Sequence, residues 1–185
     1  MRLRQRDLHR QLRQQQAAAR DRIAEMVRPL DMAKLNEHPE PNGWSVGQVL
    51  EHLCKSDEAY VRPLTELLAR SHPDAGAAAR EWKSSFVGGR IAAALENPKP
   101  IKRGPPRFRP GPTPRNGVVQ SFIDGETRFL QAMDDALPYD WKALRIKSPA
   151  LPRWAPSMNL GDGFRIHVVH ITRHASQIER LVEKL

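Results

Sequence analysis

The strongest constraint on the fold is the spacing of apolar residues, which recur at steps of three, four or seven over four long stretches of the chain. Because an α-helix turns about 100° per residue, this spacing places them on one helix face. No stretch alternates apolar and polar residues as a half-buried strand does. The pattern predicts four amphipathic helices, with Arg and Gln on the exposed face of the first: 8–30, 46–70, 119–137 and 163–184.

Capping and breaking residues mark the boundaries of these helices. Ser45 followed by Gln48 forms the capping box of the second helix, and Asp162 is expected to cap the last one. Pro63 is expected to kink or divide the second helix. Residues 77–96 favour one extra helix. The sequence therefore predicts an all-α fold, an antiparallel four-helix bundle with a fifth helix still open.

Two irregular segments separate the helices. Residues 97–115 hold seven of the sixteen prolines and six basic residues without an acid, which predicts a Pro-rich basic insert. Residues 139–161 form an irregular loop before the last helix, and a loop of this length is often functional. With 185 residues, of which 39% are hydrophobic, the chain can bury one sizeable core. We expect a single bundle domain over 1–185.

Charge is concentrated at two places in the chain. Lys and Arg number 30 against 21 Asp and Glu, a net charge of +9, and the excess lies in residues 1–22 and 97–115. One interpretation is contact with nucleic acid. The sequence favours a charged helix face and a solvated linker, because Phe108 is the only aromatic residue that could stack on a base within the insert.

The apolar runs and the cysteine content indicate the cellular setting. The longest apolar run has five residues, 91–95, whereas a membrane span needs about 20. The single cysteine, Cys54, excludes an internal disulfide and a cysteine zinc cage. We expect a reducing, cytoplasmic setting, a small-molecule substrate and no membrane partner. A homodimer is compatible with exposed apolar edges on a bundle.

Three histidines of the last predicted helix lie on the flank of its apolar stripe. His167, His170 and His174 fall within about 60° of one another around the helix. His170 and His174 are four residues apart and can bind one metal ion. His52, at the edge of the second helix's stripe, is the candidate third ligand. Zinc and nickel accept neutral imidazole, and three protein ligands leave an open position for catalysis. The alternative is that these are ordinary half-buried histidines.

Asp57, Gln177 and Cys54 are further candidates near this site. Asp57 falls near the centre of the second helix's apolar stripe, where a carboxylate is costly unless it is paired. It could orient a ligating imidazole or act as a base, or it could pair with an arginine of the first helix. Gln177 lies beside the histidines and could tune ligands or bound solvent. Cys54 lies off the histidine face and is expected to be buried and inert.

Two motifs resemble those of the DinB-like (YfiT-like) proteins. They are Trp44-Ser45-Val46-Gly47-Gln48-Val49-Leu50-Glu51-His52-Leu53 and His170-x-x-x-His174-x-x-Gln177-Ile178. The resemblance implies a four-helix bundle with a divalent metal held by His52, His170 and His174. His167 has no counterpart in that pattern and is expected to support the site or to pack. The insert at 97–115 departs from the compact family plan.

The resemblance also implies a class of chemistry. The family includes thiol S-transferases that use bacillithiol or mycothiol and a mycothiol-dependent maleylpyruvate isomerase. We therefore expect a metal-dependent enzyme with zinc or nickel, in which the ion activates water or a low-molecular-weight thiol. Thiol transfer and hydrolysis both remain open. The alternative is a non-catalytic helical binding module that contacts nucleic acid through its basic segments.

Overall fold

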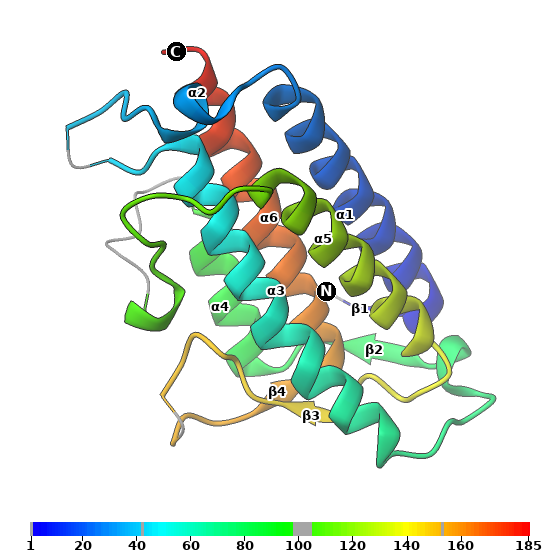
Figure 1. Ribbon diagram of the computed structural model, residues 1–185. Coiled ribbons are helices and arrows are strands. Elements are labelled where there is room, and N and C mark those ends of the chain that lie inside the picture. The colour runs from blue at the N-terminus through cyan, green and yellow to red at the C-terminus, as the bar shows by residue number, and fades with distance from the viewer. Residues whose placement is uncertain (1, 42, 98–104, 153) are drawn as a thin grey trace.

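The computed structural model describes residues 2–41, 43–97, 105–152 and 154–185. Its body is a bundle of four long helices (Figure 1): α1 (Gln5–Val27), α3 (Val46–Ala69), α5 (Val118–Asp135) and α6 (Leu160–Val182). Each of them buries an apolar face against its neighbours, because the spacing predicted from the sequence puts those side chains on one side of the helix. The prediction of an all-α bundle is confirmed.

Helices α1 and α6 run in one direction and α3 and α5 in the other (Figure 1). Around the bundle, α1 packs between α5 and α6, and α3 packs between the same two helices on the opposite side. A polar contact between α1 and α5 is consistent with these directions. His9 near the start of α1 meets Asp134 at the end of α5, at 2.8 Å, so these two helices are antiparallel.

Shorter elements complete the fold. They are β1 (Arg2–Arg4), α2 (Met32–Asn36), η1 (Ala77–Ala79), β2 (Glu81–Lys83), α4 (Phe86–Glu96), η2 (Pro106–Phe108), β3 (Arg145–Ile146) and β4 (Met158–Asn159). β1 pairs antiparallel with β2, with Leu3 opposite Trp82, and β3 pairs antiparallel with β4. These strands have two or three residues each, too few to show an alternating pattern in the sequence. The extra helix expected over 77–96 is α4, which covers only Phe86–Glu96, because residues 81–83 pair with β1 as strand β2 instead.

The chain between α3 and α5 has to return along the molecule, because these two helices run in the same direction. Helix α4 packs on α6 during this return. Residues 105–115 of the predicted basic insert then lie against α3. The Gln48 amide donates to the carbonyl of Gly111 at 2.9 Å, and Lys55 donates to the carbonyl of Arg109 at 2.8 Å. Residues 98–104 of the insert lie outside the described residues.

The helix boundaries confirm one predicted cap and correct another. Ser45 and Gln48 form the expected capping box at the start of α3. At the start of α6, however, the capping side chain is that of Asn159. Asp162 lies one turn further on, where it is buried and accepts hydrogen bonds from Ser84 and Ser85 of the α4 entrance, so the predicted cap at Asp162 was wrong.

Helix α3 continues through Pro63, so the proline does not divide it. Pro63 is exposed to solvent, where the carbonyl that loses its amide partner can be hydrated. Within the described ranges, no helix is both long and apolar enough to span a lipid bilayer.

Candidate metal centre

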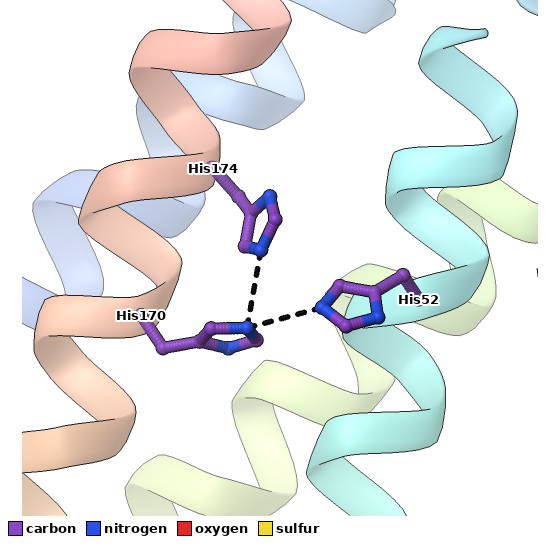
Figure 2. Close-up of side chains that lie close together, drawn as sticks. All are labelled: His52, His170 and His174. Carbon is purple, nitrogen blue, oxygen red and sulfur yellow. Dashed lines mark hydrogen bonds between the residues drawn. The ribbon is translucent and has the colours of Figure 1, made fainter. Parts of the chain in front are cut away.

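The three predicted ligands come together between α3 and α6 (Figure 2). His170 and His174 extend from successive turns of α6, and His52 faces them from α3. The Nε2 atom of His170 lies 3.1 Å from Nε2 of His52 and 3.1 Å from Nε2 of His174. The structure thus brings together side chains that are 118 residues apart in the sequence.

The outer nitrogens of two of these rings are held by oxygen atoms. His52 Nδ1 lies 2.8 Å from the carbonyl oxygen of Phe108, and His174 Nδ1 lies 2.8 Å from Oε1 of Gln177. Because these oxygens only accept hydrogen bonds, each Nδ1 has to carry the proton. The Nε2 atoms of His52 and His174 are then unprotonated in the neutral rings, and their lone pairs point at His170.

This arrangement fits a divalent metal ion. At most one proton, on His170 Nε2, is available among three converging nitrogens, so two proper hydrogen bonds cannot form at once. An ion about 2.0–2.1 Å from each nitrogen would separate them by roughly 2.9–3.4 Å for bond angles between about 90° and 109°. The observed separations of 3.1 Å lie within this interval. Both outer hydrogen bonds are the kind that orient ligating imidazoles.

Burial keeps the three rings neutral. It lowers the pKa of His52, and it lowers the pKa of His170 well below the usual range, with a further contribution from His174 beside it. Burial, followed by the proximity of His52, lowers the pKa of His174 to about 3. Neutral imidazole is the form that binds metal, so the cluster is ready for an ion at neutral pH.

One side of the cluster is closed and the other is accessible. His52 is buried, with the Trp44 ring 5.1 Å and the Phe108 ring 6.3 Å from its own ring centre. His170 and His174 are only half-buried. The exposed surface of the cluster therefore lies on its α6 side, while aromatic rings flank His52.

Asp57 and His167 lie in a second cluster, together with Glu126. One nitrogen or oxygen atom from each of these three residues lies within 4.8 Å of the others, and all three side chains are buried. Asp57 Oδ1 is 3.4 Å from His167 Nε2. The His167 ring stacks on Phe129, with 3.6 Å between ring centres. Gln177, by contrast, contacts the three-histidine cluster directly through His174.

Three features of these clusters were missed by the sequence analysis. Glu126 and Gln16 are fully buried, although Gln16 was assigned to the exposed face of its helix. A signal was present, because Gln16 stands four residues after Leu12 and three before Ala19, in the register of the apolar stripe. The carbonyl of Phe108 had no such signal, since any residue supplies a carbonyl.

Cys54 has the character expected of an inert thiol. The side chain is buried between the two clusters on α3. Burial, with a smaller contribution from the Asp57 charge, raises the pKa of Cys54 to about 11. A thiol with this pKa is almost entirely protonated at neutral pH and is a poor nucleophile.

Comparison with known proteins assigns the chain to a family. The family model of the DinB superfamily matches residues 15–178, which include all three histidines. The chain therefore belongs to the DinB superfamily. No curated protein and no solved structure matches the chain.

Proposed function

We propose that this protein is a metal-dependent enzyme in which His52, His170 and His174 hold a divalent ion, zinc or nickel. The observation that carries the proposal is the convergence of three neutral imidazoles, in which Nε2 of His170 lies 3.1 Å from Nε2 of His52 and of His174, with too few protons for both contacts to be hydrogen bonds. The match to the DinB superfamily supports it. Three protein ligands leave coordination positions open, which is the arrangement of catalytic rather than structural zinc sites.

The residues of the chain would orient and shield the site. When bound, the ion would lower the pKa of a water molecule or a thiol and supply a nucleophile at neutral pH. Phe108 and Gln177 hold the rings of His52 and His174 in one tautomer. Trp44 and Phe108 keep solvent away from His52. The half-buried rings of His170 and His174 leave one side for a small-molecule substrate.

The reaction we propose is transfer of a low-molecular-weight thiol or hydrolysis. In a thiol transfer, the attacking sulfur would come from a dissociable cofactor. Cys54 is the only cysteine of the chain, and its raised pKa of about 11 leaves it unsuited to attack. The histidines of α6 are half-buried, whereas Cys54 is buried.

A small-molecule substrate is favoured over nucleic acid by the pairing of basic residues on α1. Arg13 forms an ion pair with Asp134 at 2.9 Å, and Arg20 pairs with Asp21 at 2.8 Å. Arg22 also pairs with Glu179 of α6. These acids neutralise part of the charge that would otherwise face a phosphate backbone.

The experiment that tests the proposal is a measurement of metal content by elemental mass spectrometry. The wild type, His52→Ala and His170→Ala would be purified without chelator and compared, with circular dichroism as a check that each variant is folded. Lys34→Ala, on α2, serves as a control for substitution as such. We expect zinc or nickel to decrease by about one equivalent per chain in both histidine variants and to stay unchanged in the control.

A positive result would be followed by activity measurements on metal-loaded protein with thiol cofactors and hydrolysable esters and amides. His170→Ala, which should abolish turnover of any true substrate, is the blank. Zinc and nickel contents that are identical in the wild type and in both folded histidine variants would rule out the three-histidine site and with it the proposed mechanism.

A further inference from the structure

A layer of polar side chains crosses the centre of the bundle. Each of the four long helices contributes one member: Gln16 from α1, Asp57 from α3, Glu126 from α5 and His167 from α6. The layer separates the two clusters of apolar residues that form the core. On α1, for example, Leu12 belongs to one cluster and Ala19 to the other, with Gln16 between them.

The polar atoms of this layer are strongly under-bonded. Both oxygens of Asp57 and both ring nitrogens of His167 are buried without a hydrogen-bond partner, and so is Oε1 of Glu126. Glu126 Oε2 accepts a hydrogen bond from the Gln16 amide. An unpaired buried polar group costs about 1–3 kcal/mol, and an unpaired buried charge costs more. The layer is therefore incomplete as it stands.

The distances within the layer fit a shared cation better than direct hydrogen bonds. His167 Nε2 lies 3.4 Å from Asp57 Oδ1 and 3.6 Å from Glu126 Oε2. Nitrogen–oxygen hydrogen bonds are usually about 2.7–3.2 Å long. Two ligand atoms that each lie about 2.1 Å from one ion, at a tetrahedral angle, are roughly 3.4 Å apart.

We propose that Asp57, Glu126 and His167 bind a divalent cation at the centre of the bundle, separate from the three-histidine cluster. Two carboxylates and a neutral imidazole carry a charge of −2, which one divalent ion neutralises. This mixed oxygen and nitrogen donor set suits Mn²⁺, Fe²⁺ or Zn²⁺. Bundle interiors that place carboxylates and histidines on facing helices are a recurring setting for such ions. The proposal does not depend on the function of the three-histidine cluster.

Two neighbouring residues, Gly125 and Gln16, accommodate and orient the carboxylates of this site. A Cβ atom at Gly125 would lie 2.5 Å from Oδ2 of Asp57, so the glycine leaves the room that the carboxylate occupies. A glycine in the middle of a helix costs about 1 kcal/mol relative to alanine, which is notable at a buried position of α5. Gln16 donates to Oε2 of Glu126, the oxygen that lies 3.6 Å from His167 Nε2, and so orients the carboxylate, while Oε1 has no hydrogen-bond partner.

A cavity open to the surface extends as far as one member of this buried layer. A cavity of about 640 Å³ between α3, α5 and the turn at Pro106–Phe108 includes Asp57 in its lining. Arg107 and Arg128 also line it, and their charges oppose the approach of a cation. Metal should therefore be supplied during expression, while the chain folds, rather than only by incubation of the folded protein.

The competing occupant of the layer is a proton. Burial, and then the charge of Glu126, raises the pKa of Asp57 well above its usual range, so a protonated carboxyl could fill the site instead of a metal. The two possibilities predict different metal contents. They also differ in what an isosteric amide would do, because an amide can replace a protonated carboxyl but is a poor substitute for a charged ligand.

The test uses the full chain in a background that lacks the three-histidine cluster. His170→Ala, His170→Ala with Glu126→Gln, and His170→Ala with Glu58→Gln would be expressed in media supplemented with Mn²⁺, Fe²⁺ or Zn²⁺. Glu58 is the matched control, because it is exposed, follows Asp57 in the chain and lines the same cavity. Metal per chain would be counted after gel filtration. The urea unfolding midpoint would be measured with and without chelator.

We expect about one equivalent of one of these metals in His170→Ala and in the Glu58 control, and at least a tenfold lower content with Glu126→Gln. Chelator should lower the unfolding midpoint of the first two proteins only. If the Glu126 variant does not fold, Asp57→Asn takes its place in the same comparison. Metal below a tenth of an equivalent in His170→Ala, or a content unaffected by either amide variant, would overturn the proposal in favour of a proton-filled layer.

Discussion

The two clusters lie at adjacent levels of α3 and α6, the second with Glu126 of α5 as well, and their polar atoms are satisfied to different degrees. His52 and His174 have their outer nitrogens held by the Phe108 carbonyl and by Gln177, and the cluster is open on the α6 side. His167, seven residues before His174 on α6, has both nitrogens buried without a partner. One histidine is held by hydrogen bonds, and the other by packing on Phe129.

The contrast indicates different roles for the two sites: access to a ligand at the three-histidine cluster, and stability of the fold at the buried layer. An exchangeable site needs ligands whose orientation survives when the ion leaves, and the hydrogen bonds to the outer nitrogens provide that orientation. A fully enclosed layer contributes to the fold only while its charges are compensated. We therefore expect the three-histidine cluster to affect activity more than stability, and the interior layer to affect stability more than activity.

The largest expected effect compares the same substitution at the two levels of α6. In metal-free protein, His167→Ala should lower the free energy of unfolding by about 3–5 kcal/mol, because it leaves a cavity beside Phe129 and removes the group that faces two buried carboxylates. His174→Ala should change it by less than about 1 kcal/mol, since His174 is half-buried and its loss relieves crowding of lone pairs.

Urea unfolding at pH 7 after treatment with chelator measures both free energies. Equal losses in the two variants would show that the levels do not differ in their structural role, and the contrast drawn above would then be wrong.

A smaller effect concerns the thiol that lies between the clusters on α3. Because burial raises the pKa of Cys54 from 9.0 to about 11, the thiolate fraction at pH 8 should be about 100-fold lower in the folded chain than in the unfolded one. The alkylation rate should therefore fall by about tenfold or more, because the higher nucleophilicity of a thiolate with a raised pKa offsets part of the loss, and it should still be rising with pH above 9. Iodoacetamide labelling from pH 7 to 10, with and without urea, measures this rate. Rapid labelling of the folded chain at pH 8 would place Cys54 in an accessible site.

The sequence predicted the bundle and the three-histidine cluster because both depend on helical periodicity. His170 and His174 share a face at four-residue spacing, and His52 falls at the edge of a stripe on a capped helix, so position made them candidates for one site. The resemblance to the DinB-like motifs favoured the same three residues. Asp57 was recognised as a carboxylate on an apolar stripe, but not its partners. A helical stripe shows that a side chain points inward, without showing which side chain of another helix it meets.

Other parts of the structure had no local signal. The acceptor for His52 is the backbone of Phe108, and it is placed by contacts such as Gln48 to Gly111 that link residues 63 positions apart. Asn159 rather than Asp162 caps α6, and the Asp162 carboxylate instead accepts hydrogen bonds from Ser84 and Ser85 at the start of α4. Both outcomes depend on tertiary contacts rather than on the segment that contains the residue.

The smallest expected effect tests whether Gly125 is required by the carboxylate of the interior layer. In a helix interior, Gly→Ala usually stabilises by about 1 kcal/mol. At Gly125, however, the new methyl group would lie 2.5 Å from Oδ2 of Asp57, and overpacking of this kind costs about 1–3 kcal/mol. Gly125→Ala should therefore destabilise by about 1 kcal/mol in urea unfolding. Gly89→Ala in α4, where the nearest atom is the Ser84 hydroxyl at 3.2 Å, is the matched control and should be neutral or stabilising.

The sign of the Gly125 effect should depend on Asp57. With Asp57→Ala the crowded oxygen is gone, so adding Gly125→Ala to that variant should restore the usual stabilisation of a helix by alanine. A double-mutant cycle on the two positions measures this reversal as a coupling free energy of about 1–3 kcal/mol. A coupling near zero would show that the glycine serves packing in general. Gly125 would then give no independent support for a charged group in the buried layer of Gln16, Asp57, Glu126 and His167.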